Sequence, residues 1–261
     1  MSERKAPVVL PAAWDGLRRF TDARIALGRA GHSLPTEAHL AFQLAHAQAR
    51  DAVHLPLDVA GMADDLRALD LEVLTLRSAA RDRPTYLQRP DLGRRLDPAS
   101  QEVLTHRASA PWVDLALVVA DGLSALGVMQ NAVALLRPLL ERLRADTAQP
   151  WTLAPVVLVE QGRVAVGDPI GLALKARMVV VLIGERPGLS SPDSMGIYFS
   201  WDPRPGLTDA QRNCISNVRP AGLAPAQAAA RLHALLGRAR QLQLTGVSLK
   251  DETDEPSVRI G

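Results

Sequence analysis

The sequence predicts an α/β protein in which helices cover both faces of a mainly parallel sheet. The first observation is the run Met178–Ile183, six large apolar residues without polar alternation, which indicates a strand buried on both faces. The second is the alternation of strand-like and helix-like segments from residue 111 onward. The third is composition, because 47% of the 261 residues are hydrophobic, enough for a substantial core.

The N-terminal part of the chain is expected to be mostly helical. Apolar residues recur at helical spacing over 12–28, over about 35–53 and over 56–76. We therefore expect a helical N-terminal region with an arm in residues 1–98, used for subunit docking. An α/β domain that contacts the ligand is expected to follow in residues 99–261.

Residues 81–98 form the arm, and their composition differs from that of their surroundings. They contain five arginines and three prolines, and the prolines prevent one continuous helix. Composition leaves two interpretations open. One is a solvated linker. The other is an ordered arm on a partner protein or an anionic ligand, because Tyr86 and Leu87 would contribute nothing in free solvent.

The α/β domain is predicted as a Rossmann-like succession of strands and helices, whose first crossover should be right-handed. Its predicted elements are a strand at Val113–Ala120, a helix from Ala125 that bends near Pro138, a strand at Pro155–Val159, a short extended piece at Val164–Val166, a helix through Leu174 with Asp168 as N-cap, the buried strand Met178–Ile183, a strand at Met195–Trp201 and a helix at Pro225–Leu244.

Two turns at strand ends are expected to frame one crevice. Asp121–Ser124 and Gly184–Gly188 each follow a predicted strand, and turns after parallel neighbours lie at the same edge of a sheet. Asp121 and Ser124 also have a plain structural explanation, since either can cap the following helix. Glu185 has no such explanation, because no helix is predicted to begin there.

The sequence contains no recognisable catalytic or metal-binding motif. It has no Gly-x-Ser-x-Gly tract, no Walker loop and no Gly-x-Gly-x-x-Gly, and Cys214 has no histidine close in sequence. His39, His46 and His54 are too widely spaced for a metal site on one helix. We therefore expect this chain to bind a ligand and to contribute no catalytic residue and no metal ligand.

Charge and hydropathy exclude two further classes of function. The net charge of +2 gives no basic field for nucleic acid, and no run approaches the ~20 apolar residues of a membrane span. A single cysteine and the lack of a secretory signal predict a cytoplasmic protein. Three lysines leave 27 arginines among the 30 basic residues, a bias that suits interfaces and phosphate-bearing ligands but can equally be a compositional habit of the genome.

Five tracts, in order and with compatible spacing over about residues 20–245, carry a resemblance to a known family. They are Thr21-x-Ala-Arg-Ile-Ala-Leu-Gly-Arg-Ala-Gly31, Tyr86-Leu-x-Arg-Pro-Asp-Leu-Gly-Arg-Arg-Leu96, Asp121-Gly-Leu-Ser124, Gly184-Glu-Arg-Pro-Gly-Leu189 and Cys214-Ile-Ser-Asn217. Each tract alone is a weak signal. Together they resemble the small (light) subunit of ethanolamine ammonia-lyase.

The resemblance implies an adenosylcobalamin-dependent lyase that converts ethanolamine to acetaldehyde and ammonia by radical chemistry. It implies a large subunit, a TIM barrel that binds ethanolamine, with cobalamin between the two subunits and six copies of each. Activity is then expected only from the combined subunits. The alternative is a stand-alone α/β protein that binds another nucleotide-like ligand.

By the same resemblance, Val164, Glu185 and Cys214 are the positions that contact cobalamin. The corrin carries amide arms that suit a carboxylate, and its flat edge suits small apolar neighbours. For Cys214 the alternative is a buried small hydrophobic residue. The resemblance also favours an ordered arm, with Tyr86, Arg89, Arg94 and Arg95 at the subunit interface or the cofactor rim.

Two further expectations concern the cobalt and the location of the enzyme. No histidine lies in an Asp-x-His-x-x-Gly pattern, by which some cobalamin proteins displace the cofactor's own base, so we expect dimethylbenzimidazole to stay on cobalt. Family members can carry a longer N-terminal extension associated with a bacterial microcompartment. Here about 20 residues precede the first tract, and Pro7 and Pro11 interrupt any targeting helix, which argues against encapsulation.

Overall fold

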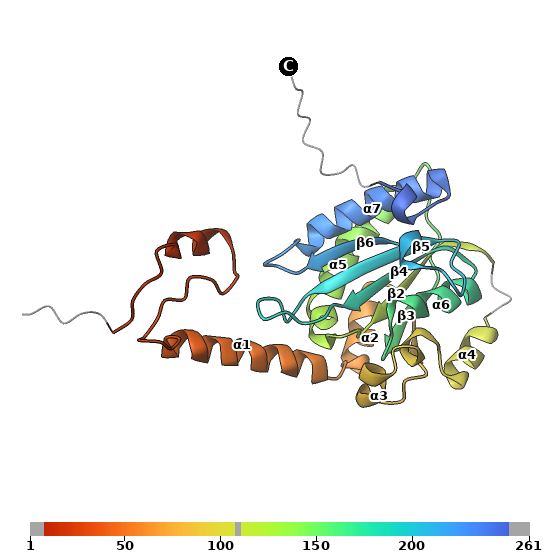
Figure 1. Cartoon of the computed structure of the whole chain (residues 1–261). Coiled ribbons are helices and arrows are strands. Elements are labelled where there is room, and N and C mark those ends of the chain that lie inside the picture. Colours follow the sequence, from red (N-terminus) through yellow and green to blue (C-terminus); the bar gives the residue numbers. More distant parts are fainter. Residues whose placement is uncertain (1–7, 108–110, 251–261) are drawn as a thin grey trace, which may run out of the picture.

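The computed structural model describes residues 8–107 and 111–250, and its centre is a six-stranded sheet in the order β1-β3-β2-β4-β5-β6 (Figure 1). The strands are β1 (Val73–Arg77), β2 (Val113–Ala120), β3 (Val156–Glu160), β4 (Ala176–Gly184), β5 (Met195–Trp201) and β6 (Asn213–Val218). The α-helices are α1 (Thr36–His54), α2 (Val59–Arg67), α3 (Arg83–Gln88), α4 (Pro98–Thr105), α5 (Ala125–Ala145), α6 (Gly167–Ala173) and α7 (Pro225–Leu242).

The sheet is mixed, so a mainly parallel, Rossmann-like sheet is not confirmed as a whole. Strands β1, β3, β2 and β4 are parallel, whereas β5 pairs antiparallel with β4, and β6 pairs antiparallel with β5. Only residues 185–194 connect β4 to β5. A parallel strand would need a crossover of a dozen or more residues, usually with a helix, so this short connection reverses the chain direction.

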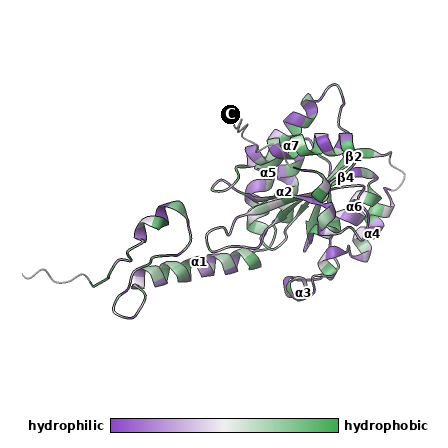
Figure 2. Ribbon diagram, turned by 45° about the horizontal axis from the view of Figure 1, so that its top comes forward, coloured by the Kyte–Doolittle hydropathy of each residue, from purple (hydrophilic) through white to green (hydrophobic). Residues whose placement is uncertain are grey.

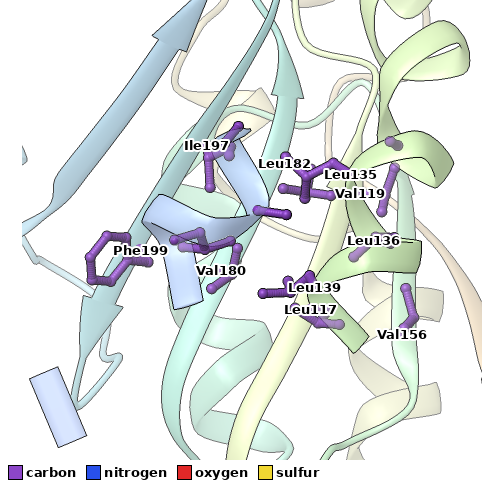
Figure 3. Close-up of a cluster of buried hydrophobic side chains, with 14 of the residues drawn as sticks. Leu117, Val119, Leu135, Leu136, Leu139, Val156, Val180, Leu182, Ile197 and Phe199 are labelled. Atoms are coloured by element: carbon purple, nitrogen blue, oxygen red, sulfur yellow. The ribbon is translucent and has the colours of Figure 1, made fainter. Parts of the chain in front are cut away.

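Helices cover both faces of the sheet, as predicted. On one face, α2, α5 and α7 pack against the strands in the larger core cluster; the view in Figure 3 includes Leu135, Leu136 and Leu139 beside Leu117 and Val180. On the other face, α4 and α6 pack against the alternate residues of the same strands. Leu115–Ala120 in β2, Val156–Val159 in β3 and Met178–Ile183 in β4 are therefore apolar on both faces, which explains why these stretches show no alternation.

The prediction of one helix over residues 56–76 is wrong for its second half. Helix α2 ends at Arg67, Asp70 adopts a positive φ of 61°, and Val73–Arg77 form edge strand β1, which pairs with β3. Val73 packs in one core cluster and Leu74 and Leu76 in the other, which is the period of a strand. The sheet therefore contains strands from both predicted regions, residues 1–98 and residues 99–261.

Residues 12–28 also differ from the prediction. They contain the 3-10 helix Asp15–Phe20, in which no residue is buried, rather than a continuous α-helix. Together with α1 this segment extends away from the sheet (Figure 1). In Figure 2 the same segment carries hydrophobic stretches although it lies apart from the core.

The arm is ordered on its own chain, so the interpretation as a free linker is wrong. It forms α3 and a 3-10 turn at Leu92–Arg94, and Leu96 bridges back to Ser78. Tyr86 is completely buried and therefore lies inside this chain rather than on the outer surface of the arm. Arg89, Arg94 and Arg95 are exposed, and Asp91 pairs with Arg89 and Arg95. Their expected contacts with a partner or cofactor stay predictions.

Two local predictions next to α6 are corrected. Val164–Val166 form a 3-10 helix rather than an extended piece, and Asp168 does not cap the following helix. Its carboxylate instead accepts two hydrogen bonds of 2.7 Å from the guanidinium of Arg212. Both side chains are buried, so this ion pair joins α6 to the start of β6 inside the protein.

Candidate functional site

A pocket of about 400 Å³ lies where β3 and β4 end, and two of the three predicted site residues, Val164 and Glu185, line it. The remaining lining residues come from the turns after β2 and β3, from the end of β4, from β5 and from the arm: Tyr86, Leu123, Arg163, Ile183, Gly184, Arg186 and Tyr198. Pockets at the carboxyl ends of parallel strands are the usual ligand sites of α/β sheets. A larger pocket of about 570 Å³ beside Arg94 and Leu207 contains none of the predicted site residues.

The two turns predicted to frame a crevice do lie at the same edge of the sheet, but they contact each other. The backbone N–H of Leu123 donates to the carbonyl of Gly184 at 2.9 Å, and a Cβ at Gly184 would overlap the carbonyl oxygen of Ser124. Ser124 caps α5 by accepting from the N–H of Gly127, its expected structural role. Leu123 from the first turn and Gly184–Arg186 from the second both line the pocket, together with Arg163 and Val164 from the turn after β3.

Glu185 is held by groups from β5 and β6 and the loop before them. Its Oε2 accepts the hydroxyl of Ser194 at 2.5 Å and the backbone N–H of Asn217 at 3.2 Å. A Cβ at Gly196 would lie 2.9 Å from Oε1, so the missing side chain there leaves room for the carboxylate. These contacts present a negatively charged acceptor in a fixed position at the edge of the pocket.

Cys214 lies beside the pocket rather than in it. It pairs with the pocket residue Tyr198 across β5 and β6, and it is exposed, so the alternative of a buried hydrophobic residue is wrong. Its thiol is 3.2 Å from the hydroxyl of Ser216. Burial, followed by interactions with Cys214 and Glu185, raises the pKa of the Tyr198 hydroxyl, which therefore stays protonated and can donate a hydrogen bond at neutral pH.

Sequence reasoning missed Tyr198 and the arginines of this site. The guanidinium groups of Arg83 and Arg163 stack on the ring of Tyr86, 4.7 and 4.2 Å from its centre, and the tyrosine hydroxyl donates to the carbonyl of Gly162. The proximity of Arg163 to Val164 in sequence was the one available signal. Its stacking on the arm could not be read from local spacing.

Asp121 is a buried carboxyl group behind the pocket. It does not cap α5; its Oδ1 accepts the N–H of Gly162, and Arg83 lies 3.8 Å from its Oδ2. Burial raises the pKa of Asp121 from 3.8 to about 6, although the hydrogen bonds from Gln161 and Gly162 and the charge of Arg83 oppose this change. The ionised carboxylate is thus less favourable in the folded chain than in water.

Asp121→Asn is expected to remove a pH dependence of stability. A carboxyl group whose pKa is raised on folding stabilises the fold fully below about pH 4, and this contribution is lost as pH rises through 6. Between pH 4 and 7, the native protein should therefore lose on the order of 2 kcal/mol of unfolding free energy relative to Asp121→Asn. Urea unfolding of both proteins across this range measures the difference; a difference independent of pH would contradict the assignment.

Neither a metal-ligand cluster nor a membrane-spanning helix is found in the described residues. Residues 8–107 and 111–250 contain no group of three or more histidine, cysteine or acidic side chains that could hold a metal ion. Within the same ranges, no helix is both long and apolar enough to cross a membrane. The fold and the pocket define an α/β protein with a candidate ligand pocket at the carboxyl ends of its strands.

Comparison with known proteins identifies the family. A model of the family "Ethanolamine ammonia-lyase light chain (EutC)" matches residues 11–250. The chain belongs to this family, whose members are lyase subunits, and the resemblance noted in the sequence is confirmed.

Three relatives, each named ethanolamine ammonia-lyase small subunit, show the extent of the similarity. The protein of Azotobacter vinelandii is 62% identical over 97% of this chain and 93% of its own length. That of Ralstonia nicotianae is 60% identical over 95% and 92%. That of Pseudomonas paraeruginosa is 60% identical over 94% and 89%.

Proposed function

We propose that this chain is the small subunit of an adenosylcobalamin-dependent ethanolamine ammonia-lyase, which converts ethanolamine to acetaldehyde and ammonia. In this proposal the chain holds the periphery of cobalamin, while a large TIM-barrel subunit binds ethanolamine, and six copies of each subunit assemble. The observation that carries the proposal is the fixed carboxylate of Glu185 at the edge of a pocket shared with Val164, in a chain of this family.

The size and chemistry of the pocket fit part of a corrinoid. A space of about 400 Å³ accommodates an edge of such a large ligand and not the whole, which agrees with a cofactor shared between two chains. Glu185 can accept from an amide arm, Val164 gives partly buried apolar surface, and exposed Cys214 continues this surface along β6.

This chain's part in the reaction is to bind and orient the cofactor. Adenosylcobalamin, when bound, supplies the radical chemistry through its cobalt–carbon bond. Glu185 and the protonated hydroxyl of Tyr198 offer one acceptor and one donor to the periphery of the ligand. None of the described residues that line the pocket is a histidine, which supports the proposal that dimethylbenzimidazole stays on cobalt.

The N-terminal segment is proposed to dock on the large subunit. Helix α1 has 19 residues, of which only Ala45 and Ala52 are buried. Leu40, Phe42 and Leu44 are all more than 40% exposed, and Trp14, Leu17 and Phe20 are exposed in the segment before it. A helix is stabilised in a protein mainly by packing of its apolar face, so an additional chain is needed to cover these side chains.

The proposed function is tested by corrinoid retention in three samples: this chain, a large subunit of the enzyme, and both together. Only the mixture should retain cyanocobalamin after gel filtration and, with adenosylcobalamin, form acetaldehyde from ethanolamine. In the mixture, Glu185→Gln should weaken corrinoid binding about 10-fold, because a charged acceptor is lost. Glu102→Gln, an exposed glutamate on α4, is the matched control and should bind as the native chain does.

Two outcomes would count against the proposal. Binding of another nucleotide-like ligand by this chain alone, with no corrinoid retention in the mixture, would favour a stand-alone binding protein. Formation of acetaldehyde by this chain without the large subunit would contradict the assignment of catalysis to the partner.

A further inference from the structure

The pocket is lined by an arginine, Arg163, that forms no ion pair within the described residues. Arg163 lines the pocket, and within the described residues no carboxylate lies within ion-pair distance of its guanidinium group. Its Nη2 donates to the backbone carbonyl of Tyr86 at 3.1 Å, while its buried Nε has no hydrogen-bond acceptor. A buried donor without an acceptor is costly, so this position is short of acceptors.

The neighbouring charged residues do not supply Arg163 with a hydrogen-bond acceptor or a counter-charge. Arg83 stacks on the same tyrosine ring, and its Nη2 is also buried without an acceptor. The carboxylate of Asp121 is 3.8 Å from the guanidinium of Arg83 and is not within ion-pair distance of Arg163. Glu185, which shares the pocket with Arg163, already accepts hydrogen bonds from Ser194 and Asn217, and Arg186 adds a further cation to the lining. The pocket is therefore electropositive on the side of Arg163.

Arg163 is also held in position before any ligand arrives. Its backbone N–H donates to the carbonyl of Gly93 at 2.8 Å, and its side chain crosses Gly93 so closely that a Cβ there would lie 2.7 Å from its Cγ. The guanidinium also stacks on the ring of Tyr86, 4.2 Å from its centre. A cation fixed in this way loses little conformational entropy on binding, which favours affinity for an anion.

We propose that Arg163 binds a phosphate group of the ligand. The inference rests on the proposed function, since cobalamin carries one anionic group of this kind, the phosphodiester of its nucleotide loop. The planar N–H groups of a guanidinium match phosphate oxygens, and Arg163, which lines the pocket without a carboxylate at ion-pair distance among the described residues, can make such a charge-assisted contact. Arg163 is a binding residue in this role, and it orients the nucleotide side of the cofactor.

The test compares three corrinoids on the complex of this chain with the large subunit. Cobinamide lacks the phosphate and the base, cobinamide phosphate adds the phosphate alone, and cyanocobalamin carries both. Arg163→Gln should weaken cyanocobalamin and cobinamide phosphate about 10- to 100-fold and leave cobinamide unchanged. Arg163→Lys should keep part of the affinity. Arg177→Gln, the same charge change on an exposed residue at the other end of β4, should change none of the three.

Other outcomes separate this inference from the proposed function. An equal loss for all three corrinoids would mean that Arg163 is structural or binds a carboxylate of the large subunit, and no loss for any would mean that it does not touch the ligand; either result overturns the inference alone. If the native complex retains no corrinoid, the proposed function fails and the inference fails with it. Equal thermal midpoints of the variants and the native chain confirm that the comparison is between folded proteins.

Discussion

Replacing Asp168 by asparagine is expected to destabilise the chain by about 3–5 kcal/mol, because the guanidinium of Arg212 would remain buried without its counter-charge. The two side chains are 2% and 3% exposed and are joined by two hydrogen bonds of 2.7 Å. Ser200 and the carbonyl of Leu207 also accept from Arg212 but carry no charge, and the exposed carboxylate of Asp209 is 4.0 Å from its Nε, too far for a hydrogen bond. Urea unfolding, with the midpoint and slope measured separately, gives the change in free energy.

A double replacement distinguishes loss of the pair from loss of packing. Asp168→Leu with Arg212→Met removes both charges from the interior, and most of the stability should return. If Asp168→Asn lowers the free energy of unfolding by less than about 1 kcal/mol, water reaches the guanidinium of Arg212 and the ion pair does not hold α6 to β6.

The double variant Leu40→Ser, Leu44→Ser is expected to lose association with the large subunit by more than about 100-fold. The two leucines lie one turn apart on α1 and are 57% and 60% exposed, so their replacement should leave the fold of this chain intact. In the complex they would be covered, and each would lose the free energy of burying a large apolar side chain. Size-exclusion chromatography of the mixed subunits measures the association.

Val247→Ser is the matched control for the docking surface. Val247 is 80% exposed and lies at the other end of the chain, so its replacement should leave association unchanged. If the α1 double variant still elutes with the large subunit at native affinity, the N-terminal segment has another role and the docking proposal is wrong.

The parts of the fold that local pattern could predict are those whose sequence period is unambiguous. Strands β2 and β4, which contain the apolar runs Leu115–Ala120 and Met178–Ile183, and the helices α5 and α7 appear where the sequence indicates them. Strand β1 was missed because a short apolar segment directly after a helix has no period of its own. The antiparallel direction of β5 follows from the shortness of residues 185–194, a signal that was present in the spacing.

The residues of the candidate site were predicted from a family resemblance and not from a local sequence pattern. Val164, Glu185 and Cys214 came from a family resemblance, and the structure brings the first two into one pocket with Cys214 beside it. Their contact with cobalamin stays a prediction. Arg212 is 44 residues from Asp168, and no local pattern links the two. In the same way, the finding that no carboxylate of the described residues lies within ion-pair distance of Arg163 is visible only when the arm, β3 and β4 are seen together.

The reversal of chain direction after β4 determines which part of the sheet is not covered by a crossover helix. Helix α6, which leads from β3 to β4, covers the face to which Tyr198 also belongs. A right-handed crossover to a parallel strand at the place of β5 would continue in the same sense and lay another helix over this face. Because β5 runs back instead, no α-helix separates β4 from β5 in residues 111–250, and half-buried Tyr198 and exposed Cys214 leave an open strand surface that suits a broad planar ring system.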